Sequence, residues 1–143
     1  MLVAVLNGPN LNLLGRREPA VYGTATLADI ERAVRAEAER LGFGIEWLQT
    51  NHEGVMIDAV QQLEGRVHGA LVNAAAWTHT SLALRDALLA VRVPFVEVHL
   101  SNVFAREPER RHSLMADLAI GVVAGFGVQS YLLGLQALAQ RLK

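Results

Sequence analysis

A tyrosine and two adjacent arginines in one polar loop are the residues whose types first suggest chemistry. The loop runs from Gly15 to Gly23, with Arg17 as the second arginine and Tyr22 near its end. The two glycines could act as hinges of a mobile lid. A tyrosine is a poor base at neutral pH, but a nearby guanidinium stabilises its phenolate. Arg17 could therefore make Tyr22 a base. The alternative is a tyrosine that packs on the loop beside solvated arginines.

Glu97 and His99 form a second candidate pair. Side chains two positions apart on a strand point to the same face, so this carboxylate would lie beside the imidazole. It could orient the ring and favour the protonated form that a general acid needs. The alternative is a histidine that is merely satisfied at a strand end. A metal site built from His79, His99 and His112 is the weaker interpretation, because no helical spacing of histidines and no carboxylate cluster supports it.

Other polar side chains follow the apolar runs of the sequence. Asn10 follows the first run and Asn73 follows the third. Residues 78–81 open a helix, whose free N–H groups could bind a carboxylate or a phosphate. Ordinary capping of that helix by Thr80 or Ser81 is the alternative.

Leu100 and Ser101 follow the fourth apolar run and could present backbone and hydroxyl donors. Arg106 and Arg110 lie in the loop behind them. One of these arginines could hold a substrate oxygen, while the other is solvated or lies at an interface. Spacing alone does not choose between them.

The elements that must position these side chains alternate along the chain. Short apolar runs bounded by turn residues predict strands over 2–6, 43–48, 69–72, 95–100 and 119–124. Apolar spacings of three and four predict a helix over 27–41, with Thr26 as its cap and Gly42 at its end. Further helices are predicted over about 55–63, over 81–91 with Ser81 as N-cap, and over about 128–142.

This alternation predicts an α/β fold. Near-continuous apolar strands indicate a parallel sheet covered on both faces, and right-handed crossovers favour a doubly wound, flavodoxin-like sandwich with a five-stranded parallel sheet. A chain of 143 residues fits one domain over 1–143. Ligands of such folds bind beyond the carboxyl ends of the strands, where the polar segments would converge.

Composition excludes several classes of function. A net charge of -1 gives no broad basic surface for nucleic acid or an anionic membrane, and the absence of cysteine excludes disulfides and thiol nucleophiles. Without cysteine an oxidising compartment is not indicated, so we expect a cytoplasmic protein. The apolar start of the chain lacks a basic leader and is broken at 7–10, so we expect it to form the first strand. The hydrophobic fraction of 52% is high, and some of this apolar surface could cover subunit interfaces.

Three longer motifs occur in order along the chain. The first is Leu6-Asn7-Gly8-Pro9-Asn10-Leu11-Asn12-Leu13-Leu14-Gly15-Arg16-Arg17-Glu18 with Tyr22-Gly23. The second is Asn73 with Thr78-His79-Thr80-Ser81 and Arg85-Asp86-Ala87, and the third is Glu97-Val98-His99-Leu100-Ser101-Asn102 with Ala105-Arg106-Glu107. Together they resemble the signatures of the type II 3-dehydroquinate dehydratases over essentially the whole chain.

The resemblance implies a lyase of the shikimate pathway to chorismate and the aromatic amino acids. It would convert 3-dehydroquinate to 3-dehydroshikimate by trans elimination of water through an enolate, without metal or organic cofactor. Tyr22 matches the base that takes the proton next to the carbonyl, and His99 matches the acid that protonates the departing hydroxyl. Arg17 matches the arginine that favours the tyrosinate and stabilises the transition state.

The resemblance also implies supporting roles. Glu97 would orient His99, and Asn10 would hold a water against the developing enolate oxygen. Asp86 would reach the site of a neighbouring subunit, since the family forms trimers that assemble into dodecamers. The positions that match contacts to substrate hydroxyls and the carboxylate are Asn73, His79, Leu100, Ser101 and Arg110.

Some positions depart from the family pattern. Residues 74–77 replace a segment usually richer in Gly or Pro, so the turn after the third strand could differ in shape. Glu109 stands where the family often has phenylalanine, and Leu114 where it often has tyrosine. The loop around Arg110 could therefore be packed differently.

Three alternatives remain beside a biosynthetic lyase. The same reaction could serve quinate catabolism. A catalytically idle homologue could act as a scaffold or sensor, although all the proposed proton-transfer residues are present. A flavodoxin-like nucleotide or flavin module fits the fold pattern, but the segment 7–10 is neither a dinucleotide-binding glycine motif nor a P-loop.

Overall fold

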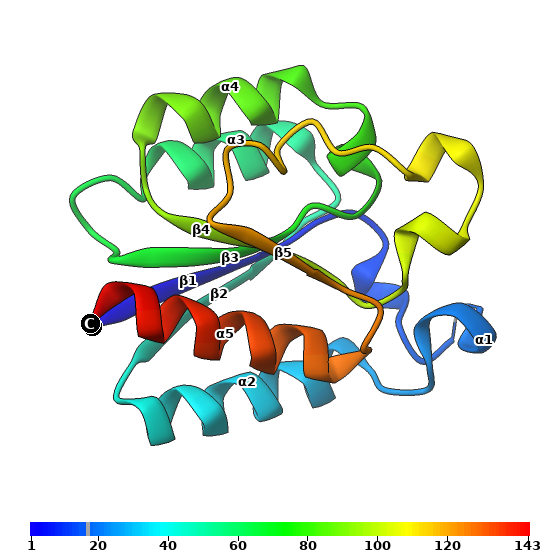
Figure 1. Ribbon diagram of the computed structural model, residues 1–143, viewed down its shortest axis with the longest axis horizontal. Coiled ribbons are helices and arrows are strands. Elements are labelled where there is room, and N and C mark those ends of the chain that lie inside the picture. Colours follow the sequence, from blue (N-terminus) through cyan, green and yellow to red (C-terminus); the bar gives the residue numbers. More distant parts are fainter. Residues whose placement is uncertain (17) are drawn as a thin grey trace.

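The computed structural model describes residues 1–16 and 18–143 and contains a five-stranded parallel sheet in the order β2-β1-β3-β4-β5 (Figure 1). The predicted doubly wound, flavodoxin-like α/β fold is thereby confirmed. The strands are β1 (Leu2–Asn7), β2 (Gly44–Gln49), β3 (Gly69–Asn73), β4 (Phe95–His99) and β5 (Gly121–Ala124). The α-helices are α1 (Pro19–Tyr22), α2 (Leu27–Leu41), α3 (Glu53–Gln61), α4 (Leu82–Val91) and α5 (Val128–Leu142). Short 3-10 helices in the loops are η1 (Leu11–Leu13), η2 (Ala75–His79), η3 (Val103–Ala105) and η4 (Pro108–Arg110).

Two helical layers cover the sheet, with α2 and α5 on one face and α3 and α4 on the other (Figure 1). Successive side chains of β1 enter these layers alternately, as the period of a strand requires. Val3 and Val5 belong to the core under α2 and α5, whereas Ala4 and Leu6 belong to the core under α3 and α4. Because β1 and β3 are buried on both faces, their sequences are apolar runs up to their final asparagines, whereas in the equally buried β4 Glu97 and His99 alternate with the valines.

The predicted helix caps are present. The Thr26 hydroxyl accepts a hydrogen bond from the Asp29 N–H, and the Asp29 carboxylate accepts one from the Thr26 N–H, which closes a capping box. Gly42 ends α2 at a φ of 86°. The Ser81 hydroxyl caps α4 by accepting the Leu84 N–H at 2.9 Å.

Two elements differ from the prediction by two residues at a boundary, and β1, β2, β3 and β4 differ by one residue. Helix α3 begins at Glu53 and ends at Gln61, because the apolar pattern marks the buried stripe and not the first turn. Strand β5 begins at Gly121. Ala119 lies before it in a turn, where its N–H donates to the Met115 carbonyl.

The order of the strands locates the functional edge of the sheet. The chain leaves β1 toward β2 and later returns to the other side of β1 at β3, so the strand order reverses between these two neighbours. Ligands of open α/β sheets bind beyond the carboxyl ends of the strands at such a reversal. The segments that follow β1, β3 and β4 lie at this edge with α1 beside them, toward the right of Figure 1.

Candidate active site

A pocket lies at the carboxyl edge of the sheet and gathers most of the predicted site residues. It is lined by Pro9, Asn10, Leu11, Tyr22, Asn73, Ala75, Ala76, His79, His99, Leu100, Ser101, Val103, Arg106 and Arg110. These residues come from segments that are far apart in the sequence. The fold therefore brings the three sequence motifs to one place.

A close approach of two loops forms one wall of this pocket. The Gly8 N–H donates to the Asn73 carbonyl at 2.8 Å. A Cβ at position 8 would lie 2.4 Å from the Ala74 carbonyl oxygen, so the backbones can approach this closely only with glycine there. This contact places Asn10 and Asn73 on the same pocket.

Tyr22 lines the pocket beside a guanidinium. Arg106 Nη1 donates to the Tyr22 hydroxyl oxygen at 2.9 Å, and the guanidinium carbon lies 5.2 Å from the centre of the ring. The Arg106 side chain is 15% exposed and lies 3.8 Å from the carboxylates of Glu18 and Glu107. A cation that donates to a phenol oxygen stabilises the phenolate, so this geometry suits a tyrosine base.

His99 and Glu97 point to the same face of β4, as their spacing predicted. His99 Nε2 lies 2.6 Å from Glu97 Oε2, and both side chains are almost completely buried. A carboxylate accepts hydrogen bonds, so it holds the proton on Nε2 and leaves Nδ1 as the ring nitrogen for a ligand. The ring also lines the pocket. This arrangement suits a general acid.

Asn73 is held from behind by a buried tyrosine. Asn73 Nδ2 donates to the Tyr131 hydroxyl at 2.9 Å, and this hydroxyl donates to Asn7 Oδ1 at 2.6 Å. The Asn73 side-chain oxygen accepts the Ala75 N–H at 3.2 Å. Burial raises the pKa of Tyr131, so its phenol stays neutral and serves as a structural link between β1, β3 and α5.

His79 faces His99 across the pocket, with ring centres 6.5 Å apart. Its Nδ1 lies 2.7 Å from the His112 carbonyl oxygen and must donate a proton to it. Burial lowers the pKa of His79, and the positive charges of His99, Arg110 and His112 act in the same direction. The neutral ring therefore keeps Nε2 as an acceptor for a ligand hydroxyl.

The start of α4 is an ordinary cap. The Ser81 hydroxyl is used in capping, and the Thr80 hydroxyl donates to the Ala76 carbonyl. Thr78 and His79 belong to η2, before α4 begins at Leu82. The capping alternative is thus the one that these contacts support.

Of the predicted site residues that the structure describes, Glu97 and Asp86 do not line this pocket, and Glu97 reaches it only through its contact with His99. Asp86 is exposed on α4. Arg17 lies outside the described residues. Ser101 and Arg110 line the pocket, and Arg110 also pairs with Glu107.

Three residues with clear contacts in the site were missing from the predicted set. Arg106 is one of two loop arginines between which spacing does not choose, and its contact with Tyr22 joins positions 84 residues apart. Ser113 and Tyr131 touch predicted residues from behind. The signature that contains Arg106 could have pointed to it, whereas no local pattern marks the other two.

The three histidines do not form a metal site. Within the part of the chain that the structure describes, no group of His, Asp or Glu side chains has an arrangement that could hold a metal ion. His79 Nδ1 and His99 Nε2 are already bonded to protein oxygens. None of the helices in the same residues has the length and hydropathy of a membrane span.

Comparison with known proteins agrees with the motifs. The family model for class II dehydroquinase matches residues 1–139. The chain is 56% identical over 143 residues to the 3-dehydroquinate dehydratase of Gemmatimonas aurantiaca, covering 100% of this chain and 94% of that protein. It is 52% identical over 141 residues to the catabolic 3-dehydroquinase 1 of Aspergillus terreus, covering 99% and 93% of the two chains.

A solved structure extends the similarity to three dimensions. The type II dehydroquinase from Propionibacterium acnes has a TM-score of 0.93 and 40% identity to this chain, and the match covers 97% of this chain and 96% of that one. The two chains therefore share their fold over almost the whole length.

Proposed function

Because the chain belongs to the class II dehydroquinase family, we propose that 3-dehydroquinate loses water in the pocket between Tyr22 and His99. Family membership makes the chain a 3-dehydroquinate dehydratase, a hydro-lyase. The observation that carries the site assignment is the pairing of a tyrosine–guanidinium contact with a histidine–carboxylate contact on one pocket. We propose that the whole chain acts as a single domain.

Tyr22 is the base in this proposal. The guanidinium of Arg106 donates to the Tyr22 oxygen, which as the phenolate takes the proton next to the substrate carbonyl. We also propose Arg17 as the arginine that stabilises the tyrosinate and the transition state, on the strength of the family motif alone. The carbonyl then becomes an enolate, and Asn10 holds a water against its oxygen.

His99 is the acid. Glu97 fixes the ring through Nε2, so that Nδ1 is the nitrogen that gives a proton to the departing hydroxyl. One proton leaves the carbon and one joins the hydroxyl, which balances the loss of water. The substrate hydroxyls and carboxylate are bound by groups that line the pocket, namely Asn73, His79, Leu100, Ser101 and Arg110.

The pathway is proposed to be the biosynthetic one to chorismate and the aromatic amino acids, in the cytoplasm. The same reaction in quinate catabolism is the alternative, since a catabolic relative is 52% identical. Deletion of the gene separates the two. If the deletion strain requires added aromatic amino acids, the biosynthetic role is supported. If its only defect is a loss of growth on quinate, the biosynthetic role is contradicted.

We propose that the chain assembles into trimers and that these form a dodecamer. Exposed apolar side chains support this, including Phe104 and Phe126, each 63% exposed, and Val122 on the edge strand β5. Asp86 lies on the surface of α4, where it is free to reach a neighbouring site.

An activity assay tests the proposed function. Purified protein is mixed with 3-dehydroquinate in metal-free buffer with a chelator, and the conjugated enone product is followed by ultraviolet absorbance. We expect rapid formation that the chelator does not change. Absence of product from folded protein would contradict the proposal and favour the idle homologue.

A further inference from the structure

We propose that Ser113 is a positioning residue of this reaction, which holds the Glu97 carboxylate in the orientation that presents the His99 ring to the pocket. The inference rests on the proposed function and adds a residue to its acid side. Ser113 belongs to the segment between η4 and β5 and does not line the pocket around Tyr22.

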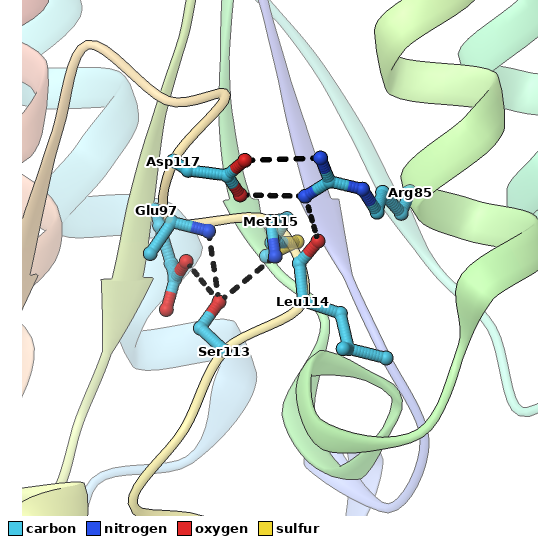
Figure 2. A network of polar contacts seen from close by, with 7 residues as sticks. Arg85, Glu97, Ser113, Leu114, Met115 and Asp117 are labelled. Carbon is cyan, nitrogen blue, oxygen red and sulfur yellow. Dashed lines mark hydrogen bonds and ion pairs between the residues drawn. The ribbon is translucent and has the colours of Figure 1, made fainter.

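The hydroxyl of Ser113 has one direction in which it can donate. Its oxygen accepts the N–H of Met115 at 3.1 Å and the N–H of Ala116 at 3.0 Å. A hydroxyl has two acceptor sites and one proton, so these two bonds leave only the proton free. That proton is donated to Glu97 Oε1 at 2.7 Å (Figure 2).

Glu97 is thereby held at both oxygens. The carboxylate is 2% exposed, with Oε1 bonded to Ser113 and Oε2 bonded to His99. A buried carboxylate is costly unless its oxygens are hydrogen-bonded. Without the Ser113 proton, Oε1 loses the donor that the structure gives it. The carboxylate is then free to rotate out of the orientation in which Oε2 contacts His99 Nε2.

The segment that carries Ser113 is itself tied to α4. Arg85 Nη1 donates to the Leu114 carbonyl at 2.9 Å, and the Arg85 guanidinium pairs with Asp117 at 2.5 and 2.9 Å (Figure 2). Asp117 anchors the same segment as Ser113 but has no bond to Glu97 among the contacts of Figure 2. It therefore offers a matched control for loosening of the segment.

Steady-state kinetics test the inference with Ser113→Ala, Glu97→Gln, the double variant and Asp117→Ala. Loss of a hydrogen bond to a charged group should lower kcat about 10- to 100-fold in Ser113→Ala, with KM changed less than about threefold. The Ser113→Ala change should have little further effect in the Glu97→Gln background, because coupled residues are not additive. Ser113→Thr should recover most of kcat, and Asp117→Ala should stay close to wild type.

Several results would overturn it. These are a wild-type kcat in Ser113→Ala, an equal loss on the Glu97→Gln background, or the same loss in Asp117→Ala. Ser113→Cys keeps a weak donor and should have an intermediate kcat even if Ser113→Ala does not fold, and a wild-type kcat there contradicts the inference. An inactive wild type overturns the proposed function and this inference with it, whereas an active wild type with unaffected Ser113 variants overturns the inference alone.

Discussion

The two tyrosines of the chain show how residues of one type are assigned to different tasks by their surroundings. Tyr22 is partly exposed, and its hydroxyl oxygen accepts a hydrogen bond from the Arg106 guanidinium. Tyr131 is completely buried between two asparagines, and burial raises its pKa. Only the first has the surroundings of a base.

Tyr131→Phe should lower both the stability of the fold and the affinity for substrate. The change leaves Asn7 Oδ1 and Asn73 Nδ2 without their partner, and an unsatisfied buried polar group costs about 1–3 kcal/mol. We expect a fall of that size in the free energy of unfolding in urea, together with a raised KM. Tyr22→Phe is the control and should change the unfolding free energy by less than about 1 kcal/mol. Equal stability of Tyr131→Phe and wild type would contradict the structural role.

His79 should make the protein less stable in mild acid. Burial lowers its pKa in the folded chain, whereas the unfolded chain titrates near the ordinary value of about 6.5. As the pH falls through that value, the unfolded state takes up a proton that the folded state binds less well, so unfolding becomes more favourable. Above it both states are neutral and the effect vanishes. Wild type should lose more unfolding free energy than His79→Gln between about pH 7.5 and 5.5, and parallel losses would refute this.

Residue types and spacing predicted the contacts at the residue scale only where the partners are close in sequence. Glu97 and His99 share a strand, so their period alone indicates the contact that is observed. The contact of Tyr22 with Arg106 depends on two loops that only the folded sheet brings together. Such long-range pairs have no local pattern.

At the scale of elements, the turn after β3 shows what the departure at residues 74–77 does to the backbone. Ala75 has a φ of 51°, in the left-handed region that favours glycine. Its N–H donates to the Asn73 side chain, and the turn continues into η2, which carries His79 to the pocket. The chain thus makes this turn with a residue that is strained there.

Ala75→Gly should therefore stabilise the protein. Relief of the left-handed strain outweighs the greater flexibility of glycine in the unfolded chain by roughly 0.5–1 kcal/mol. Ala76→Gly is the matched control, because position 76 has no positive φ and glycine there should lower stability. Thermal unfolding of both variants measures the difference. A lower melting temperature for Ala75→Gly would show that the alanine is not strained.

Strands and caps were predictable because their signals are local. The capping box of α2 and the Ser81 cap of α4 follow from residue types at fixed spacing. The loops were not predictable, since the 3-10 helices η1 to η4 depend on contacts with distant segments such as the hydrogen bond from the Leu114 N–H to the Thr78 carbonyl. These loops carry most of the pocket.

At the scale of the whole molecule, the apolar surface is the feature that a single chain leaves unexplained. Phe104, Val122 and Phe126 are exposed, and β5 is an edge strand of the sheet. Exposed apolar side chains beside an edge strand favour association. The proposed dodecamer would bury them.

Light scattering coupled to size exclusion tests that assembly. We expect a mass twelve times that of one chain, and a substitution such as Val122→Lys on the edge strand should reduce it. Subunit mixing adds a second test, because inactive Tyr22→Phe and Asp86→Ala chains should recover activity together if Asp86 serves a neighbouring site. A monomeric wild type would contradict the proposal.

Exchange of the substrate proton in deuterium oxide tests the central claim most directly, since it separates the base from the acid. Mass spectrometry would follow deuterium entering 3-dehydroquinate next to the carbonyl. His99→Ala should lower product formation about 100- to 10,000-fold while exchange continues, because Tyr22 still forms the enolate. Tyr22→Phe should abolish both exchange and product. Exchange that persists in Tyr22→Phe, or vanishes only in His99→Ala, would contradict the assignment of the two roles.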